Sequence, residues 1–95
     1  MKKKNISKEI GQLRMEILKY KKYGRMTDMY EGMFDRDPQN TKLEEKADAA
    51  YAKHFDALQA AAKIIVSLIH VDTKIAWKMV ITQTDKVLDL TYRVQ

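Results

Sequence analysis

The amino-acid sequence predicts an all-α protein, a three-helix bundle with helices at about residues 5–33, 38–69 and 73–94. Its 95 residues include only three glycines and one proline. Apolar residues recur every three or four positions, and no stretch alternates apolar and polar residues as a half-buried strand does. A chain of this length is expected to form one domain with a modest core.

The first helix is predicted from an apolar stripe with a helical period, and Asn5 or Ser7 is a suitable cap for its start. After Gly24 the apolar positions change phase, so we expect a bend at that glycine and an end near Met33. The stripe before the glycine consists of Ile6, Ile10, Leu13, Ile17 and Tyr20.

The second helix contains residues 54–70, the only long run in which apolar side chains occupy most of a helical circumference. So broad an apolar face needs neighbours on more than one side, so we expect this helix to be the central one. The sequence allows two starts for this helix. Pro38 is suitable as the first helical residue after Asp37, and a capping box that begins at Thr41 is the alternative. The face comprises Tyr51, Phe55, Leu58, Ala61, Ala62, Ile64, Ile65, Leu68 and Ile69.

The third helix is predicted to begin after a break near residues 70–73, where Asp72 and Thr73 are candidate caps. It carries two apolar stripes centred roughly 120° apart. The first, expected in the core, is Ala76, Val80, Val87, Leu90 and Val94; the second is Trp77, Ile81, Leu88 and Tyr92. A helix of a three-helix bundle needs one apolar face, so the second stripe is predicted to bind a partner protein or a second copy that completes the bundle.

The net charge of +5 is unevenly distributed along the chain. Residues 1–26 hold nine basic and two acidic residues, whereas residues 27–56 hold four basic and eight acidic ones. This asymmetry favours an anionic partner, although a lysine-rich helix face that is simply solvated is the alternative. The candidate anion-binding residues are Lys8, Arg14, Lys19, Lys21, Lys22 and Arg25. A helix-turn-helix is not indicated, because the helix that follows is the apolar core helix.

Residues typical of catalytic or metal sites are scarce in this sequence. There is no cysteine, which excludes disulfides and thiolate sites and suits a reducing compartment, so we expect a cytoplasmic protein. His54 lies on an apolar helix face, where it is expected to be a core residue with one hydrogen-bonded nitrogen. His70, sixteen positions later, points to a different side, so the two cannot share a metal within one helix. We therefore expect no metal, no cofactor and no enzymatic activity.

The most apolar window, residues 57–71, is shorter than the roughly 20 residues that cross a membrane. The leading hypothesis is a non-enzymatic helical protein-interaction module, of the adaptor, chaperone or immunity type, that contacts a partner protein or forms a homodimer. The alternative is a nucleic-acid-binding accessory protein that uses its basic first helix.

Overall fold

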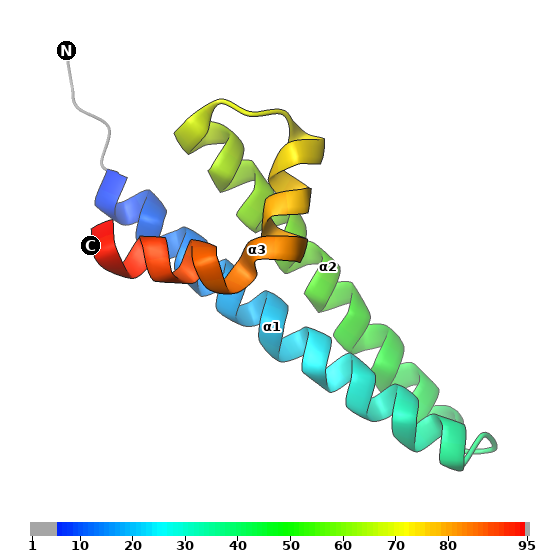
Figure 1. Cartoon of the computed structure of the whole chain (residues 1–95). Helices are drawn as coiled ribbons and strands as arrows, with labels where there is room; N and C mark the ends of the chain where they lie inside the picture. Colours follow the sequence, from blue (N-terminus) through cyan, green and yellow to red (C-terminus); the bar gives the residue numbers. More distant parts are fainter. Residues whose placement is uncertain (1–5, 95) are drawn as a thin grey trace.

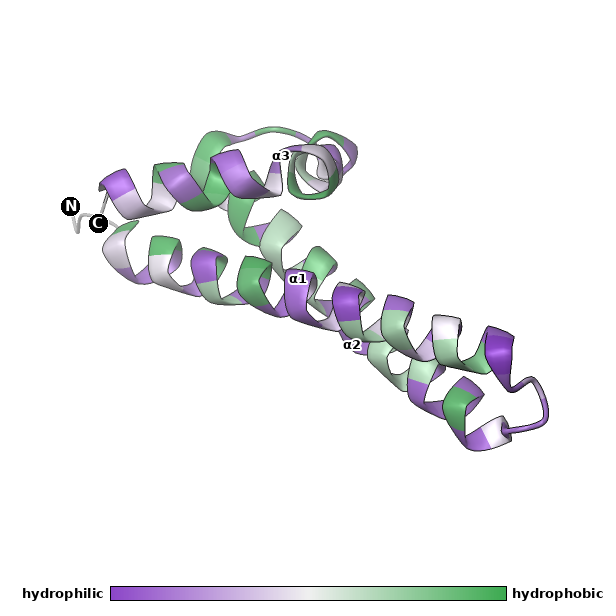
Figure 2. Ribbon diagram, turned by 60° about the horizontal axis from the view of Figure 1, so that its bottom comes forward, coloured by the Kyte–Doolittle hydropathy of each residue, from purple (hydrophilic) through white to green (hydrophobic). Residues whose placement is uncertain are grey.

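A computed structural model, which describes residues 6–94, confirms the all-α class (Figure 1). Three helices pack together: α1 spans Ile6–Arg36, α2 spans Thr41–Ile69 and α3 spans Thr73–Val94. The molecule is elongated, measuring 59 × 23 × 21 Å. Its length comes from α1 and α2, which form a long antiparallel hairpin, while α3 lies across one end of this hairpin (Figure 2).

We call the end of the hairpin that α3 covers the capped half, and residues 22–54 the open half. The boundary follows the contacts of α3, since Lys21 of α1 pairs with Asp85 and Phe55 of α2 meets Trp77. All three helices contribute to the core of the capped half, and α2 packs against both α1 and α3, as its broad apolar face predicts. This core consists of Leu13, Ile17, Leu58, Ala61, Ala62, Ile65, Ala76, Val80, Val87 and Leu88.

The open half is held by a narrower contact between α1 and α2. Its buried residues are Thr27 on α1 and Leu43, Ala47 and Ala50 on α2, most of them small. Tyr51, which the sequence assigns to the broad apolar face of α2, is exposed. Tyr51 lies in the open half, beyond the reach of α3, so its side of the helix faces solvent.

The helix bounds refine the prediction for the first two helices. α1 runs through Gly24 as a single helix, as predicted, and it ends at Arg36, three residues beyond the predicted end near Met33. Pro38 then stops the helix, since it disfavours the α conformation at Asp37. α2 begins at Thr41, the later of the two predicted starts, and the side chain of its cap residue, Asn40, makes no capping hydrogen bond. The predicted cap at Asn5 lies outside the described residues.

The predicted break between α2 and α3 is confirmed. His70 adopts the left-handed conformation, with φ 55° and ψ 37°, and its backbone N–H donates to the Val66 carbonyl at 3.0 Å. Helices commonly end on such a residue, which is usually glycine. The carboxylate of Asp72 then accepts a hydrogen bond from the Ile75 backbone N–H at 2.8 Å and so caps α3.

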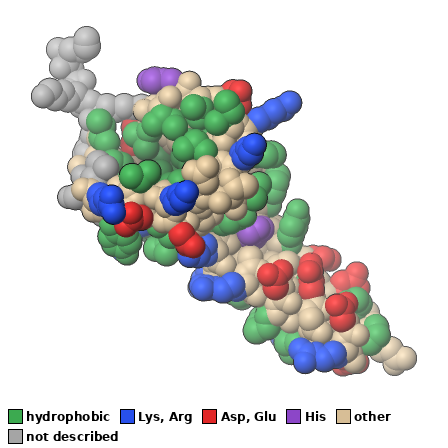
Figure 3. All heavy atoms as spheres, in the orientation of Figure 1, with side chains coloured by type: hydrophobic (Ala, Val, Ile, Leu, Met, Phe, Trp, Pro, Cys, Tyr) green, Lys and Arg blue, Asp and Glu red, His purple; other side chains and the backbone are tan. Residues whose placement is uncertain are grey.

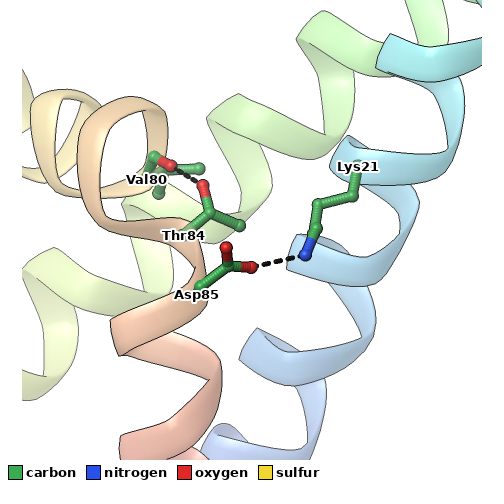
Figure 4. Close-up of polar contacts among 4 residues, drawn as sticks. All are labelled: Lys21, Val80, Thr84 and Asp85. Carbon is green, nitrogen blue, oxygen red and sulfur yellow. Dashed lines mark hydrogen bonds and ion pairs between the residues drawn. The ribbon is translucent and has the colours of Figure 1, made fainter.

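α3 is kinked at Gln83, whose φ of −131° and ψ of 30° are not helical. Threonines flank this residue: the Thr82 hydroxyl donates to the Lys78 carbonyl at 2.6 Å, and the Thr84 hydroxyl donates to the Val80 carbonyl (Figure 4). Such hydroxyl groups compete with backbone N–H groups for the carbonyl oxygens, which bends helices. After the kink α3 turns and runs over the N-terminal part of α1 (Figure 1).

Candidate protein-binding surfaces

The second apolar stripe predicted on α3 is not one exposed face. Ile81 and Tyr92 are 53% and 57% exposed, as an interface stripe would be, but Leu88 is only 9% exposed and belongs to the core. Trp77 is half-buried, and its ring meets the Phe55 ring edge-on with 5.6 Å between centroids. The expectation that these four residues share one exposed surface is therefore wrong.

The kink explains why each predicted stripe of α3 contains both buried and exposed residues. Before Gln83 the buried residues follow the first predicted stripe, whereas after it Val87 and its neighbour Leu88 are both buried. The buried face has thus moved to a position between the two stripes. Leu90, which was assigned to the core, is 56% exposed as a result. The side chain of Val94, from the same stripe, lies outside the described part of the chain.

Two of the six candidate anion-binding residues hold α3 in place. The Arg14 guanidinium lies 3.8 Å from the centroid of the Tyr92 ring and donates to the Tyr92 hydroxyl. The Lys21 Nζ contacts the Asp85 carboxylate at 2.5 Å (Figure 4). Both contacts fasten the second half of α3 to α1, so these two cations have intramolecular partners.

The other candidates lie elsewhere on α1. Two positions turn a helix by about 200°, so Lys19 points to nearly the opposite side from Lys21. Lys19 pairs with Glu16 at 3.3 Å, and Lys22 lies 5.5 Å from the Tyr23 ring centroid. Lys8 and Arg25 are exposed. At about 100° per residue, the six residues lie within an arc of roughly 160° of α1, so they share a broad side of the helix and not a single narrow stripe.

A row of three adjoining hollows runs along the hairpin on the side away from α3, and all its lining residues come from α1 and α2. Its central hollow, about 340 Å³, is lined by Glu16, Lys19, Tyr23, Lys53, Asp56, Ala57 and Ala60. This hollow shares Tyr23 and Lys53 with a hollow of about 170 Å³ toward the α1–α2 loop. It shares Glu16 and Ala60 with a third, of about 520 Å³, that reaches Met15 and Ile64. We call these three hollows together the hairpin groove.

Lysines and tyrosines alternate across the hairpin groove. The Lys53 Nζ lies 5.4 Å from the Tyr23 ring centroid, and the Lys46 Nζ lies 5.9 Å from that of Tyr30. These distances are within the range of cation–π attraction. The lysines of α2 are not among the predicted binding residues, although the sequence contains a signal for them. Both the tyrosines and the lysines are seven positions apart, so each pair shares a helix face, and the antiparallel hairpin brings the two pairs together.

The opposite side of the open half is acidic. Asp28 and Glu31 of α1 line a hollow of about 240 Å³ with Tyr51 and His54 of α2. Acidic side chains gather over this part of the hairpin (Figure 3). The two sides of the open half therefore carry charges of opposite sign.

His54 is a packing residue, as expected from its place on an apolar face. Its ring stacks on that of Tyr20 with 4.2 Å between centroids, and its Nδ1–H donates to the Tyr20 carbonyl at 2.8 Å. Burial raises the pKa of the Tyr20 phenol. Gly24 faces the same ring, since a Cβ built at this position would lie 2.9 Å from the His54 Cε1.

A second groove lies at the capped end, where all three helices meet; we call it the end groove. Its volume is about 340 Å³, and its lining is apolar apart from Thr91, whose hydroxyl donates to the Leu88 carbonyl at 2.7 Å. The lining residues are Ile6, Ile10, Ile65, Leu68, Ile69, Met79, Val87, Leu90 and Thr91.

Within residues 6–94, no three His, Asp or Glu side chains are grouped so that they could hold a metal ion. None of the three described helices combines the length and the apolar character that a membrane span requires. Comparison with protein-family models, with curated proteins and with solved structures found no match to this chain.

Proposed function

We propose that this protein is a non-enzymatic helical module that binds another protein through exposed helix faces, and that it works in the cytoplasm. The hairpin groove carries this proposal. It is an open hollow between two packed helices, on the side that the third helix leaves uncovered. Met15 is exposed at one end of it, beside the half-buried Ile64. Apolar and aromatic side chains in such a setting are typical of helix-binding surfaces.

The proposal moves the binding surface from the second stripe of α3 to the hairpin. Ile81 and Tyr92 stay exposed, but Trp77 and Leu88 are engaged in packing within the chain. A partner that approached α3 would meet only part of the predicted surface. The hairpin groove, in contrast, offers large side chains of α1 and small ones of α2 along several helical turns.

Nucleic-acid binding is the second candidate function, and one observation favours it. Lysines lie beside tyrosine rings in the hairpin groove, and bases can stack on such rings while ammonium groups contact phosphates. However, Glu16 and Asp56 line the same central hollow and would repel a phosphate backbone. A protein partner accommodates such mixed charge better.

Site-specific photo-crosslinking in cells of the source organism tests the proposed function. A photoreactive phenylalanine analogue is placed at Met15, in the hairpin groove, and at the exposed Lys74 as a control. We expect a protein adduct at position 15 that is absent at position 74. The captured protein, once purified, should bind the unmodified chain and bind Met15→Glu at least tenfold more weakly. Adducts of nucleic acid would favour the second candidate, and no adduct at position 15 would contradict the proposal.

A further inference from the structure

We infer that the hairpin groove binds an acidic amphipathic helix of the partner protein. This inference rests on the proposed function and names the chemistry of its partner. It follows from the length of the groove, from the side chains that form its walls, and from the charges at its rim.

The length of the groove suits a helix of about five turns. On α2 its lining extends from Lys46 to Ile64, which at 1.5 Å per residue is about 27 Å. α1 supplies lining residues over a similar length, from Gln12 to Tyr30. A third helix laid between two antiparallel helices contacts both along this distance, which is the geometry by which amphipathic helices bind grooves.

The walls are shaped for side chains that enter from outside. α2 contributes alanines at 49, 57 and 60, which leave space next to its backbone. α1 contributes the larger Tyr23 and Met26 on the facing wall. An apolar stripe of leucine-sized residues on the incoming helix would fill the three hollows, whose volumes are about 170, 340 and 520 Å³.

The rim of the groove selects for acidic flanks on that helix. Four lysines line it, and one of them, Lys19, is paired with Glu16. Asp56 is the other acidic lining residue of the central hollow. The net charge of these lining residues is positive. Glutamate or aspartate beside the apolar stripe of the partner would therefore be complementary and would steer its approach. The lysines are Lys19, Lys46, Lys53 and Lys63.

A second copy of the chain is a poorer occupant. Two copies facing groove to groove would bring lysines of both copies together. The acidic side of the open half has complementary charge from Asp28 and Glu31, but Tyr51 is the one large apolar side chain among the residues that line its hollow. Contact between two different sides would also be heterologous, so it would build a ring or an open filament instead of a two-fold dimer.

A synthetic helix provides the probe. An 18-residue peptide with a leucine stripe flanked by glutamates is titrated into the ¹⁵N-labelled full chain and followed by amide chemical shifts. The comparison ligands are the same peptide with lysines in place of the glutamates, and a 20-nucleotide oligothymidylate. We expect the glutamate peptide to bind at least tenfold more tightly than either, with the largest shifts at Ala49, Ala57 and Ala60.

Charge-reversal variants test the role of the rim. The double variant Lys46→Glu, Lys53→Glu should bind the glutamate peptide at least tenfold more weakly and the lysine peptide more tightly. Both positions are exposed, so circular dichroism should show an unchanged helix content. The matched control is the double variant Lys74→Glu, Lys78→Glu. It changes the net charge by the same amount at exposed positions of α3 and should leave peptide affinity unchanged.

The inference is overturned if the glutamate peptide binds no more tightly than the lysine peptide, or if the shifts gather at the end groove. It is also overturned if oligothymidylate binds more tightly than the glutamate peptide. A dimer in light scattering that the peptide does not dissociate, and that prevents peptide binding, would overturn it too. Crosslinking of a protein at position 15 without glutamate-peptide binding would reject this inference and retain the proposed function. Failure of the crosslinking itself would reject the proposed function.

Discussion

At the scale of single residues, the contact between Gly24 and His54 links α1 to α2 at the edge of the open half. The His54 ring is held on two sides, by stacking on Tyr20 and by its hydrogen bond to the Tyr20 carbonyl. A side chain at position 24 would have to displace this ring. The glycine is therefore a packing residue within a continuous helix.

Replacing Gly24 by alanine tests this contact. Alanine favours a helix over glycine by about 1 kcal/mol, but overpacking a well-ordered site costs about 1–3 kcal/mol. We expect Gly24→Ala to lower the free energy of unfolding, measured in urea, by up to about 2 kcal/mol. Gly32→Ala is the matched control, because the nearest atom to its new Cβ is the Arg36 Nη2 at 4.0 Å, and it should be stabilising. Equal stabilisation by both changes would show that the His54 ring moves aside without a cost in stability.

At the scale of helices, α2 supplies the centre of the core and α3 shows how a local distortion changes which residues are buried. Leu58 and Ile65 are buried at 5% and 3% exposure, seven positions apart on α2. Ile81 and Leu88 are also seven positions apart, on α3, yet one is exposed and the other buried. Both pairs would share a face on an ideal helix, so the difference arises from the kink between Ile81 and Leu88.

The core role of α2 is tested by truncating its central side chains. Leu58→Ala and Ile65→Ala should each lower the free energy of unfolding by about 2–5 kcal/mol, through lost burial and the cavity that remains. Urea denaturation followed by circular dichroism measures this change. Losses below about 1 kcal/mol for both variants would contradict the placement of α2 at the centre of the core.

The effect of the kink is tested by placing a charge at each of the two α3 positions. Ile81→Asp should leave a folded protein of unchanged helix content, because the side chain faces solvent. Leu88→Asp should unfold the chain, or lower its stability by several kcal/mol, since it buries an unpaired carboxylate. Circular dichroism and thermal melts of both variants distinguish the two sites. Similar behaviour of the two variants would mean that the same face of α3 is buried before and after Gln83.

At the scale of the whole molecule, the two halves of the hairpin have different support. The capped half has a core built from three helices, whereas the open half has only the narrow contact between α1 and α2. A part of a protein with fewer buried apolar contacts opens locally at a lower free energy. The tyrosine–lysine pairs of the hairpin groove and the acidic side of the hairpin thus lie on the less stable part of the chain.

Amide hydrogen exchange tests this difference directly. Amides of residues 13–17 and 61–65, in the capped half, should exchange most slowly, at the rate of global unfolding. Amides of residues 28–33 and 44–48, in the open half, should exchange at least tenfold faster. Binding of the acidic peptide should slow both groups, because the hairpin groove is lined from Gln12 to Tyr30 and from Lys46 to Ile64. Uniform protection along both helices would contradict the division into two halves.

Much of this fold is determined by sequence features that are local. The helical spacing of apolar residues, Pro38, and the cap candidates Asp72 and Thr73 were sufficient to predict three helices, their order and the packing of α2 against both other helices. These features act through neighbouring residues, so they can be recognised without knowing the tertiary structure. His54 could likewise be assigned to packing, because an isolated histidine on an apolar face has few other roles.

Only the tertiary structure decided which helix faces are covered. The kink at Gln83 redistributed the apolar residues of α3, so Leu88 became a core residue and Leu90 became exposed. Threonines at 82 and 84 are a weak local signal for it, because most helices accommodate such residues without a kink. The hairpin groove depends on the antiparallel register that sets Tyr23 beside Lys53 and Tyr30 beside Lys46. Such a pairing joins residues far apart in the chain, so it exists only once the helices have packed.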